Sequence, residues 1–243
     1  MPKLTVYRDC PLLQHPAVLP SIEHLGAGSK MQRSGDGVRA VIFTADDDPA
    51  SFCAFSRFRH LYFVEQLGWQ LDVKEGLETD AFDSDAAIYC IVLDQGQVIG
   101  GWRALPTEAP YLAQTAFPQL ATFGIYPRRP DVWEMTRLGA TRHQALIYGL
   151  MFRFALQRQV HSLVAVVDTT HERLLRRHGI RTRRYGAPRH IGVTTRGRAI
   201  EAIAGEIPLA DQDPRVIDRF LAGTRLAEIS DGTLVFRSAG ISA

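Results

Sequence analysis

Apolar residues along this chain alternate between short continuous runs, typical of buried strands, and repeats spaced three or four apart, typical of helices. The runs predict strands over 39–44, 87–93, 98–105, 132–138 and 162–167. The repeats predict helices from Asp48 to near Gly68, over 144–160, and over 171–178 before Gly179. Strands interleaved with helices in this way predict an α/β or α+β layered domain.

The segments between these elements indicate how the chain is organised. The turn Asp94-Gln-Gly-Gln predicts a hairpin between the second and third strands. The polar stretch 72–85 is expected to form a loop, and 106–130, rich in proline and aromatics, a long connection with one or two helical turns. Residues 1–37 carry scattered prolines and glycines, which predicts an N-terminal extension before one domain over 38–243. The pattern does not indicate what the extension, or the chain beyond about Pro208, contributes.

Composition narrows the class of protein. The chain has 243 residues, 46% of them apolar, and a formal net charge of only +2, so neither length nor charge calls for a nucleic-acid partner. It has no run of eighteen apolar residues, which argues against membrane insertion, and its first residues lack the apolar core of a secretory signal. The three cysteines show no zinc-ligand spacing. A cytoplasmic protein without a metal site is expected.

Five short motifs with charged and aromatic residues follow one another in a fixed order. Arg59 and Phe63 stand four apart on one face of the first predicted helix, and Trp69 follows at its exit. The remaining motifs are Gly76-Leu-Glu-Thr-Asp80-Ala-Phe-Asp83, Gly100-Gly-Trp-Arg103-Ala-Leu-Pro-Thr107 and Trp133-Glu134-Met-Thr-Arg137. Each motif alone is weakly specific, but their order and spacing together are specific.

This set resembles the acyl-homoserine-lactone synthases, the LuxI-type autoinducer synthases. Their pattern is Arg-x3-Phe-x5-Trp, Glu-x-Asp-x-Phe-Asp, Gly-x-x-Arg-Leu-x-Pro-Thr and Trp-Glu-x-x-Arg, and the match covers roughly residues 57–179. The resemblance implies a GNAT-like fold, a mixed twisted sheet flanked by helices. Two central strands, here 132–138 and 162–167, are expected to splay apart and admit the pantetheine arm of a thioester.

The implied reaction transfers an acyl group from acyl carrier protein or acyl-CoA to the amine of S-adenosylmethionine. Lactonisation then releases methylthioadenosine, and no tightly bound cofactor is needed. Glu134 is the candidate base, because burial on a strand raises the pKa of a carboxylate. The alternative is that Glu134 only pairs with Arg103 or Arg137. Glu134 and Arg137 would face opposite sides of a regular strand, so a shared site requires a β-bulge between them.

The other candidate residues carry charge or an aromatic ring. With Glu134, the catalytic candidates are Arg103 and Asp80. The candidates for binding S-adenosylmethionine are Arg59, Phe63, Trp69, Asp83 and Arg137. The arginines can bind the carboxylate of S-adenosylmethionine or hold the acidic loop. The rings of Phe63 and Trp69 can pack against the sulfonium and adenine of S-adenosylmethionine or belong to the core. Trp102 and Trp133 are interpreted as core residues, and Glu78 and Asp85 as surface-loop residues.

The acyl donor is expected to use two further regions. Position relative to the splayed strands suggests an acyl pocket lined by Met135, Leu138, Leu146, Leu150 and Ala165. The basic helix near residue 175 suggests docking of acidic acyl carrier protein or of coenzyme A phosphates through Arg173, Arg176 and Arg177. A solvated helix face is the alternative for this charge run. The sequence identifies neither the acyl chain, nor which of the two donors is used, nor the oligomeric state.

Two other functions compete with this one. A GNAT-like N-acyltransferase for a different amine would share the fold but would not require the motifs from Arg59 to Asp83. A nucleic-acid-binding protein would use the basic segment 173–184, but no motif of that class supports it. Serine and cysteine hydrolases are disfavoured because no GxSxG or Cys/His signature is present.

Overall fold

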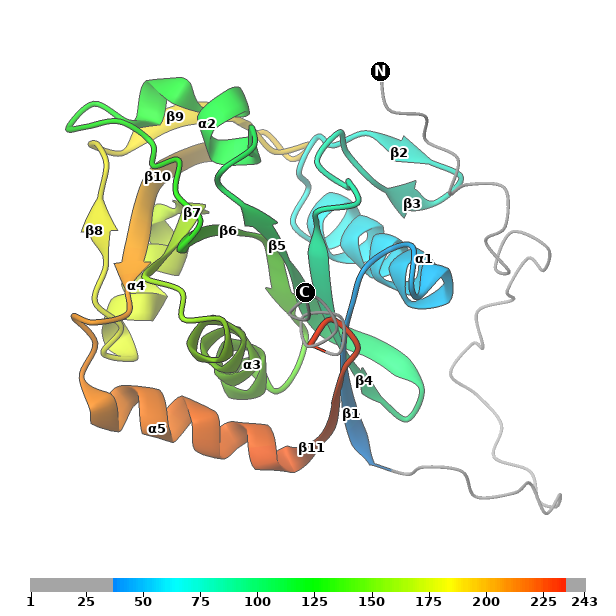
Figure 1. Ribbon diagram of the computed structural model, residues 1–243. Helices are drawn as coiled ribbons and strands as arrows, with labels where there is room; N and C mark the ends of the chain where they lie inside the picture. The colour runs from blue at the N-terminus through cyan, green and yellow to red at the C-terminus, as the bar shows by residue number, and fades with distance from the viewer. Residues whose placement is uncertain (1–36, 235–243) are drawn as a thin grey trace, which may run out of the picture.

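The structure of the chain, a computed structural model, describes residues 37–234. Within them, nine strands form one mixed, twisted sheet in the order β11-β1-β4-β5-β6-β7-β10-β8, with β9 also paired to β10 (Figure 1). The strands are β1 Val38–Phe43, β4 Ile88–Asp94, β5 Gln97–Pro106, β6 Val132–Ala140, β7 Ser162–Asp168, β8 Arg183–Arg184, β9 Arg189–Val193, β10 Ala199–Pro208 and β11 Ala227–Asp231. The pairs β1–β11 and β6–β7 are parallel, and the others are antiparallel.

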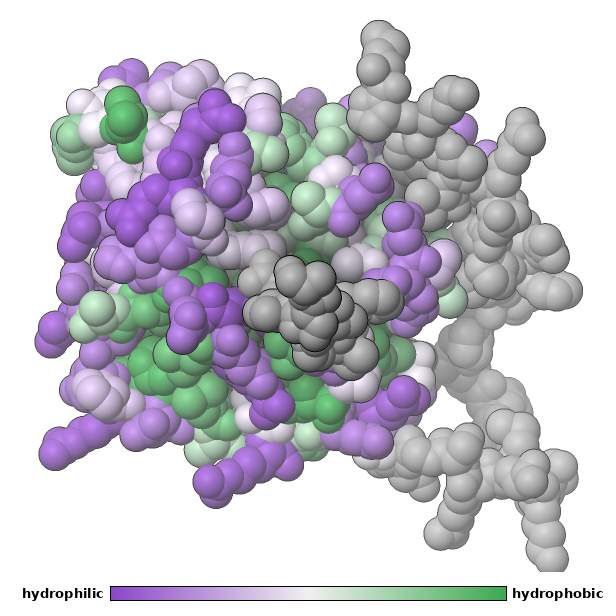
Figure 2. All heavy atoms as spheres, in the orientation of Figure 1, coloured by the Kyte–Doolittle hydropathy of each residue, from purple (hydrophilic) through white to green (hydrophobic). Residues whose placement is uncertain are grey.

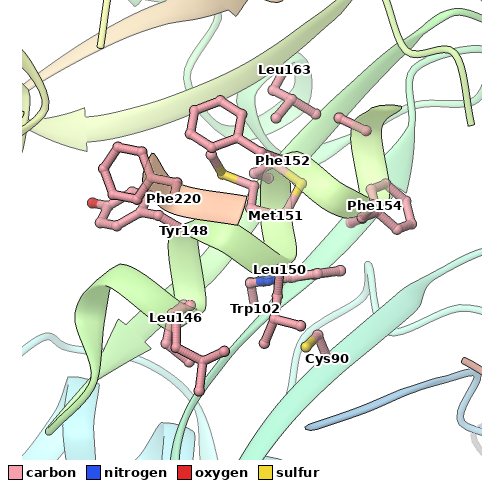
Figure 3. Close-up of a cluster of buried hydrophobic side chains, with 14 of the residues drawn as sticks. Cys90, Trp102, Leu146, Tyr148, Leu150, Met151, Phe152, Phe154, Leu163 and Phe220 are labelled. Atoms are coloured by element: carbon pink, nitrogen blue, oxygen red, sulfur yellow. The ribbon is translucent and has the colours of Figure 1, made fainter. Parts of the chain in front are cut away.

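Helices cover both faces of this sheet. They are α1 Pro49–Arg59, the π-helix η3 His60–Gln66, α2 Leu112–Ala116, the 3-10 helix η4 Pro118–Leu120, α3 Gln144–Gln157, α4 Thr169–Arg177, α5 Pro214–Gly223 and the 3-10 helix η5 Thr224–Leu226. The phenylalanines of α1 pack on one face with Tyr89 and Leu105. The apolar residues of α3 pack on the other face with Trp102 and Met135. Figure 3 shows Trp102 and Leu150 side by side in that second cluster.

The first helix begins and ends where the pattern predicts, but its geometry changes on the way. Asp48 caps it by accepting a hydrogen bond from the Ser51 N–H at 2.9 Å, and Pro49 suits the first turn. At His60 the helix widens into a π-helix, and it stops at Gly68, whose φ of 74° is left-handed. The polar loop after it contains a small hairpin, β2 Val73–Lys74 and β3 Leu77–Glu78, that the pattern does not predict.

The splay between β6 and β7 is confirmed. These strands pair only at Val132–Glu134 with Ser162–Val164, although β6 runs on to Ala140 and β7 to Asp168. Beyond Glu134 and Val164 the two strands share no ladder. The edges of the two strands therefore diverge, as the fold expectation requires.

A β-bulge lies in β6 where it pairs with β5. Gly101 pairs with Gly139 and Arg103 with Thr136, so β6 has one residue more than β5 over this interval. Arg137 sits in the extra stretch with a left-handed φ of 52°. A bulge is present, but pairing is regular from Glu134 to Thr136, so the bulge lies at Arg137 itself and not between Glu134 and Arg137 as predicted. It sends the Arg137 side chain to the same acidic loop that Arg103 reaches.

The chain beyond Pro208 completes the layers. Helix α5 packs against α3, where the Phe220 ring lies 5.7 Å from that of Tyr148 and 5.6 Å from that of Phe152 (Figure 3). Strand β11 then pairs in parallel with β1 at the edge of the sheet. Within residues 37–234, none of the helices has the length and apolar character needed to cross a lipid bilayer. The predicted extension, residues 1–37, falls outside the described residues except for Gly37.

Candidate active site

Three arginines and three carboxylates form one buried ion-pair network beside β6. Arg59 from α1 donates to Glu78 and, at 2.8 Å, to Asp83. Arg103 from β5 donates to Asp80 at 2.6 Å and to Asp83 at 2.8 Å. Arg137 closes the network with bonds of 2.9 Å to Glu78 and 2.8 Å to Asp80. The structure therefore brings together five residues predicted for the site and adds Glu78.

The interpretation of Glu78 as a surface-loop residue is wrong. Its side chain is 1% exposed and bridges Arg59 and Arg137. Its position is explained by β3, which turns Leu77 and Glu78 inward, both of them buried. The motif itself carried the signal, because Glu78 occupies the first position of the Glu-x-Asp-x-Phe-Asp pattern. Asp85 is exposed, as expected for a surface loop.

The network contains three arginines and three carboxylates, and the positive charges keep the carboxylates ionised. Burial alone would raise the pKa of Asp83, but the charges of Arg59 and Arg103 outweigh burial and hold the pKa well below its ordinary value. The same competition lowers the pKa of Asp80, with Arg103 and Arg137 as the partners. All three arginines therefore pair with the acidic loop. This favours the role of holding that loop over the role of binding the carboxylate of S-adenosylmethionine.

Two groups of the network differ from the others in exposure or in pairing. The Asp80 side chain is 20% exposed, against 1% for Glu78 and for Asp83, so it is the carboxylate of the network that solvent reaches most easily. Buried Nη2 of Arg59 has no hydrogen-bond partner among the described residues. An unpaired buried donor is costly to the folded protein. The network thus has one partly exposed acceptor, Asp80, and one unpaired donor that is buried, Nη2 of Arg59.

Glu134 lies on the same side of the sheet, but it does not hydrogen-bond to the arginines. Its two oxygens accept the backbone N–H groups of Leu112 at 2.9 Å and Ala113 at 2.7 Å, at the start of α2. Burial raises the pKa of Glu134 to about 7, although both N–H groups and the charge of Arg103 act against this. The alternative of a direct pair with Arg103 or Arg137 is not what the structure shows. A carboxylate with this pKa can take up a proton near neutral pH.

The two aromatic candidates lie against each other at the end of the first helix. The rings of Phe63 and Trp69 are 5.1 Å apart, with Phe63 buried and Trp69 partly exposed. A Cβ at Gly139 would come within 2.8 Å of the Tyr62 ring and 3.3 Å of the Phe63 ring. This close approach places the aromatic pair beside the diverging end of β6. Trp102 and Trp133 are core residues, as expected.

Four of the five residues predicted for the acyl pocket share one apolar cluster. Met135, Leu146 and Leu150 are buried on the α3 face of the sheet, and Leu138 packs against them (Figure 3 shows Leu146 and Leu150). Ala165 instead lines a small cavity between β7, β10 and α4. The predicted set is thus divided between a packed core and a cavity. Their contact with an acyl chain stays a prediction.

The predicted basic helix is present, and some of its charged side chains form ion pairs within the protein. Helix α4 is capped by Asp168 and ends before Gly179, which has a left-handed φ of 80°. Arg173, Arg176 and Arg177 are exposed on it. One carboxylate of this helix, Glu172, is buried and paired with Arg184. The exposed arginines therefore remain candidates for docking an anionic partner.

The comparisons with known proteins agree with this geometry. A family model for autoinducer synthases matches residues 50–213. An acyl-homoserine-lactone synthase from Ralstonia nicotianae is 35% identical over an alignment of 154 residues that covers 57% of this chain and 76% of that protein. One from Acinetobacter nosocomialis is 33% identical over 153 residues, 56% of this chain and 84% of that protein.

Solved structures show the same fold. TofI, in a ternary complex with an inhibitor and MTA, aligns with a TM-score of 0.61 and 34% identity over 73% of this chain and 99% of its own. BjaI, a CoA-dependent acyl-homoserine lactone synthase solved with SAM and isopentyl-CoA, aligns with a TM-score of 0.67 over 80% of this chain and 93% of its own, and its 21% identity supports the fold alone. The GNAT-like expectation is confirmed, and the chain belongs to the autoinducer synthase family of acyltransferases.

Proposed function

We propose that this protein synthesises an acyl-homoserine lactone from S-adenosylmethionine and an acyl thioester. The observation that carries the proposal is the balanced network of Arg59, Arg103 and Arg137 with the acidic loop, placed beside Glu134 at the splay of β6 and β7. That arrangement sets a binding surface for a cationic substrate next to a carboxylate able to act as a base. TofI, which was solved with MTA, and BjaI, solved with SAM and an acyl-CoA, lend support from relatives.

S-adenosylmethionine is expected to bind over the acidic side of the network. Its amine and sulfonium are cationic, and Asp80 is the carboxylate that is exposed to receive a positive charge. The Phe63 and Trp69 rings offer a cation–π contact to the sulfonium, worth on the order of 1 kcal/mol. Nη2 of Arg59, which is buried and has no partner among the described residues, is the hydrogen-bond donor proposed for the substrate carboxylate. Asp83 and Arg137 act by holding these groups in place.

The acyl transfer then needs one proton acceptor. In this step Glu134, directly or through a water molecule, takes the proton of the amine while the nitrogen attacks the thioester carbonyl. The carbon–sulfur bond breaks and the thiolate leaves with a proton. In the second step the carboxylate of the acylated S-adenosylmethionine attacks the side-chain carbon bonded to the sulfonium. The lactone ring closes and methylthioadenosine departs. Neither step calls for a metal ion or a tightly bound cofactor.

The acyl donor is either acyl carrier protein or acyl-CoA, and the reaction is placed in the cytoplasm, where both occur. Arg173, Arg176 and Arg177 present positive charge to either of them. The pantetheine arm common to both donors would enter where β6 and β7 part.

The test is to incubate the purified protein with S-adenosylmethionine and a panel of acyl-carrier and acyl-CoA thioesters, and to follow products by mass spectrometry. Methylthioadenosine together with an acyl-homoserine lactone is the expected result. Release of free thiol without methylthioadenosine would instead assign a GNAT-like N-acyltransferase that acts on another amine. A folded protein that releases neither product would refute the enzymatic proposal.

A further inference from the structure

The turn between β9 and β10 reaches across the molecule to the end of the first helix. Figure 1 shows this hairpin, with β9 in yellow, extending to the segment that follows α1 and η3. The Thr195 N–H donates to the Gly68 carbonyl oxygen at 2.7 Å, and Gln70 Nε2 donates to the Val193 carbonyl oxygen at 2.9 Å. Two segments that are far apart in the sequence are thus joined by two short hydrogen bonds.

The two segments also touch closely. Gly68 has a left-handed φ of 74°, and a Cβ there would lie 2.8 Å from Thr195 Oγ1 and 3.4 Å from the Thr194 Cβ. Both the backbone conformation and the hairpin therefore favour glycine at this position. A longer hydrogen bond, from Arg196 Nη2 to the Glu65 carbonyl oxygen at 3.4 Å, lies beside the two short ones. We call the contacts of residues 65–70 with residues 193–196 the hairpin clasp.

The tip of the hairpin is held by the clasp and not by an apolar core. Residues 195–199 are exposed, whereas Ile191, farther back in β9, packs against the apolar cluster on the α1 face of the sheet. Figure 2 shows hydrophilic side chains along the edge that carries β8, from which the chain enters β9, in contrast with the apolar side chains over α3. An exposed turn that buries little apolar surface opens easily unless hydrogen bonds hold it. The clasp therefore fixes where the tip lies.

Trp69 stands between the two residues that carry the short hydrogen bonds of the clasp. Gly68 before it accepts from the hairpin through its backbone, and Gln70 after it donates through its side chain. The Trp69 N–H donates to the Phe63 carbonyl oxygen at 2.8 Å, and the Trp69 ring, which is partly exposed, lies 5.1 Å from the Phe63 ring. The hairpin therefore holds the chain on both sides of a ring that is assigned to S-adenosylmethionine.

The chain that enters the hairpin is anchored on the other side of the site. The Phe123 N–H donates to the Tyr185 carbonyl oxygen at 2.7 Å, and a Cβ at Gly186 would collide with the Leu120 carbonyl oxygen. Leu120 ends η4, which follows the helix α2 whose N–H groups bind Glu134. The segment from β8 to β10 thus runs from the side of the site that holds the candidate base to the side that holds Trp69.

We propose that the hairpin clasp positions the Trp69 ring for S-adenosylmethionine, with Thr195 and Gln70 as the positioning residues, without contact between the hairpin and the substrate. The inference rests on the proposed function, in which the Trp69 ring contacts the sulfonium, and it adds a part of the chain that none of the site motifs contains. When the clasp opens, the ring loses its fixed position and S-adenosylmethionine binds more weakly. Glu134 keeps its own partners, so the chemical step keeps its rate.

The geometry of the turn allows the clasp to be opened while the hairpin is kept. The Gly197 N–H donates to the Thr194 carbonyl oxygen at 2.9 Å, which makes Thr195 the second residue of a four-residue turn, a position that proline favours. Thr195→Pro therefore removes the N–H that binds Gly68 and preserves the turn. Gln70→Ala, at an exposed position, removes the second short hydrogen bond. The matched control is Thr195→Ala, which loses Oγ1 but retains the N–H.

The experiment measures kcat and the KM for S-adenosylmethionine on the full chain, with the acyl thioester that gives the most lactone. Isothermal titration calorimetry without acyl donor gives the Kd for S-adenosylmethionine. Thr195→Pro with Gln70→Ala should raise KM and Kd about fivefold, the loss expected for one cation–π contact, and leave kcat within about twofold of wild type. Thr195→Ala should keep the wild-type KM. In a Trp69→Ala background, opening the clasp should change KM by less than about twofold, because both changes remove the same contact.

Two results would overturn the inference. One is a folded variant with an opened clasp that keeps the wild-type KM and Kd, whether or not its kcat changes. The other is an undiminished effect of the same variant in the Trp69→Ala background, which would mean that the clasp does not act through the ring. If Thr195→Pro does not fold by circular dichroism, Gln70→Ala with Arg196→Ala removes the two side-chain hydrogen bonds at exposed positions and should raise KM about threefold. Failure of the proposed function looks different, because the wild-type protein would then neither bind S-adenosylmethionine nor release methylthioadenosine.

Discussion

Arg137 and Glu78 lie 59 residues apart in the chain and form a two-pronged ion pair, with Nε and Nη2 of the arginine 3.0 and 2.9 Å from the two carboxylate oxygens. The pair depends on the left-handed φ of Arg137, which the bulge in β6 provides. It ties the acidic loop to the strand that also carries Glu134. Arg137 of β6 therefore helps to position Glu78 and Asp80, together with Arg59 of α1, Arg103 of β5 and the hydrogen bonds within the loop.

Removal of Glu78 should destabilise the protein strongly. Glu78→Ala leaves Arg59 and Arg137 each without one of their carboxylate partners in a buried place, a loss that typically costs about 3–5 kcal/mol. The free energy of unfolding in urea measures this. Asp85→Ala, at an exposed position of the same loop, is the control and should change stability by less than about 0.5 kcal/mol. Equal stability of the two variants would show that Glu78 does not hold the network.

Much of this fold follows from the sequence because its elements are strongly patterned. The apolar runs placed β4, β5, β6 and β7 to within a few residues, and Asp48 and Gly68 marked both ends of the first helical segment. The later strands were not predicted. β8 has only two residues and β9 is largely exposed, so neither carries the alternating burial that a pattern can detect.

The sequence identified most residues of the site, but it did not identify which of them contact one another. The motif spacing identified Arg59, Arg103 and Arg137, yet whether they bind substrate or the acidic loop depends on which carboxylates are buried beside them. Glu78 shows the difficulty, because only the tertiary position of a two-residue strand makes a loop glutamate a core residue. The partners of Glu134 were also hidden, since they are backbone N–H groups of a helix 21 and 22 residues away.

Turnover should depend on the ionisation of Glu134. Burial raises its pKa to about 7, and a base works only when deprotonated, so kcat/KM should increase with pH through about 7 and then level off. Glu134→Gln should reduce kcat by at least about a hundredfold and remove this limb of the pH profile. The melting temperature serves as the control for folding, because the amide can accept only one of the two N–H groups now bound. Full activity in Glu134→Gln would exclude Glu134 as the base.

The acidic network should make the protein sensitive to low pH through Asp83. Its pKa is well below the unfolded value of about 3.9, so its contribution to stability is complete above that value and is lost as pH falls toward the folded pKa. Asp83→Asn removes the charge at all pH values. The difference in unfolding free energy between wild type and Asp83→Asn should therefore be largest at neutral pH and shrink below about pH 4. Asp46→Asn, at an exposed position, provides the comparison, and a constant difference for Asp83→Asn would contradict the network's role.

The exposed arginines of α4 should act on encounter with the acyl donor and not on chemistry. Arg176→Glu with Arg177→Glu reverses two exposed charges, and charges of this kind chiefly change the association rate and its salt dependence. We expect a higher KM for the acyl donor at low salt, an unchanged kcat, and a difference from wild type that narrows as salt is added, because salt screens the interaction. Steady-state kinetics with a single carrier thioester at several salt concentrations measures all three.

The matched control for this reversal is Arg225→Glu, an exposed position in η5, which follows α5 in the chain. It changes the net charge in the same direction without altering α4. If Arg225→Glu raises KM as much per charge as the α4 variant, the effect comes from the overall charge of the protein and α4 is not the docking surface. If only the α4 variant responds, and the response is larger for the acidic carrier protein than for the CoA thioester, the helix recognises the protein surface of the carrier as well as the phosphate group that the two donors share.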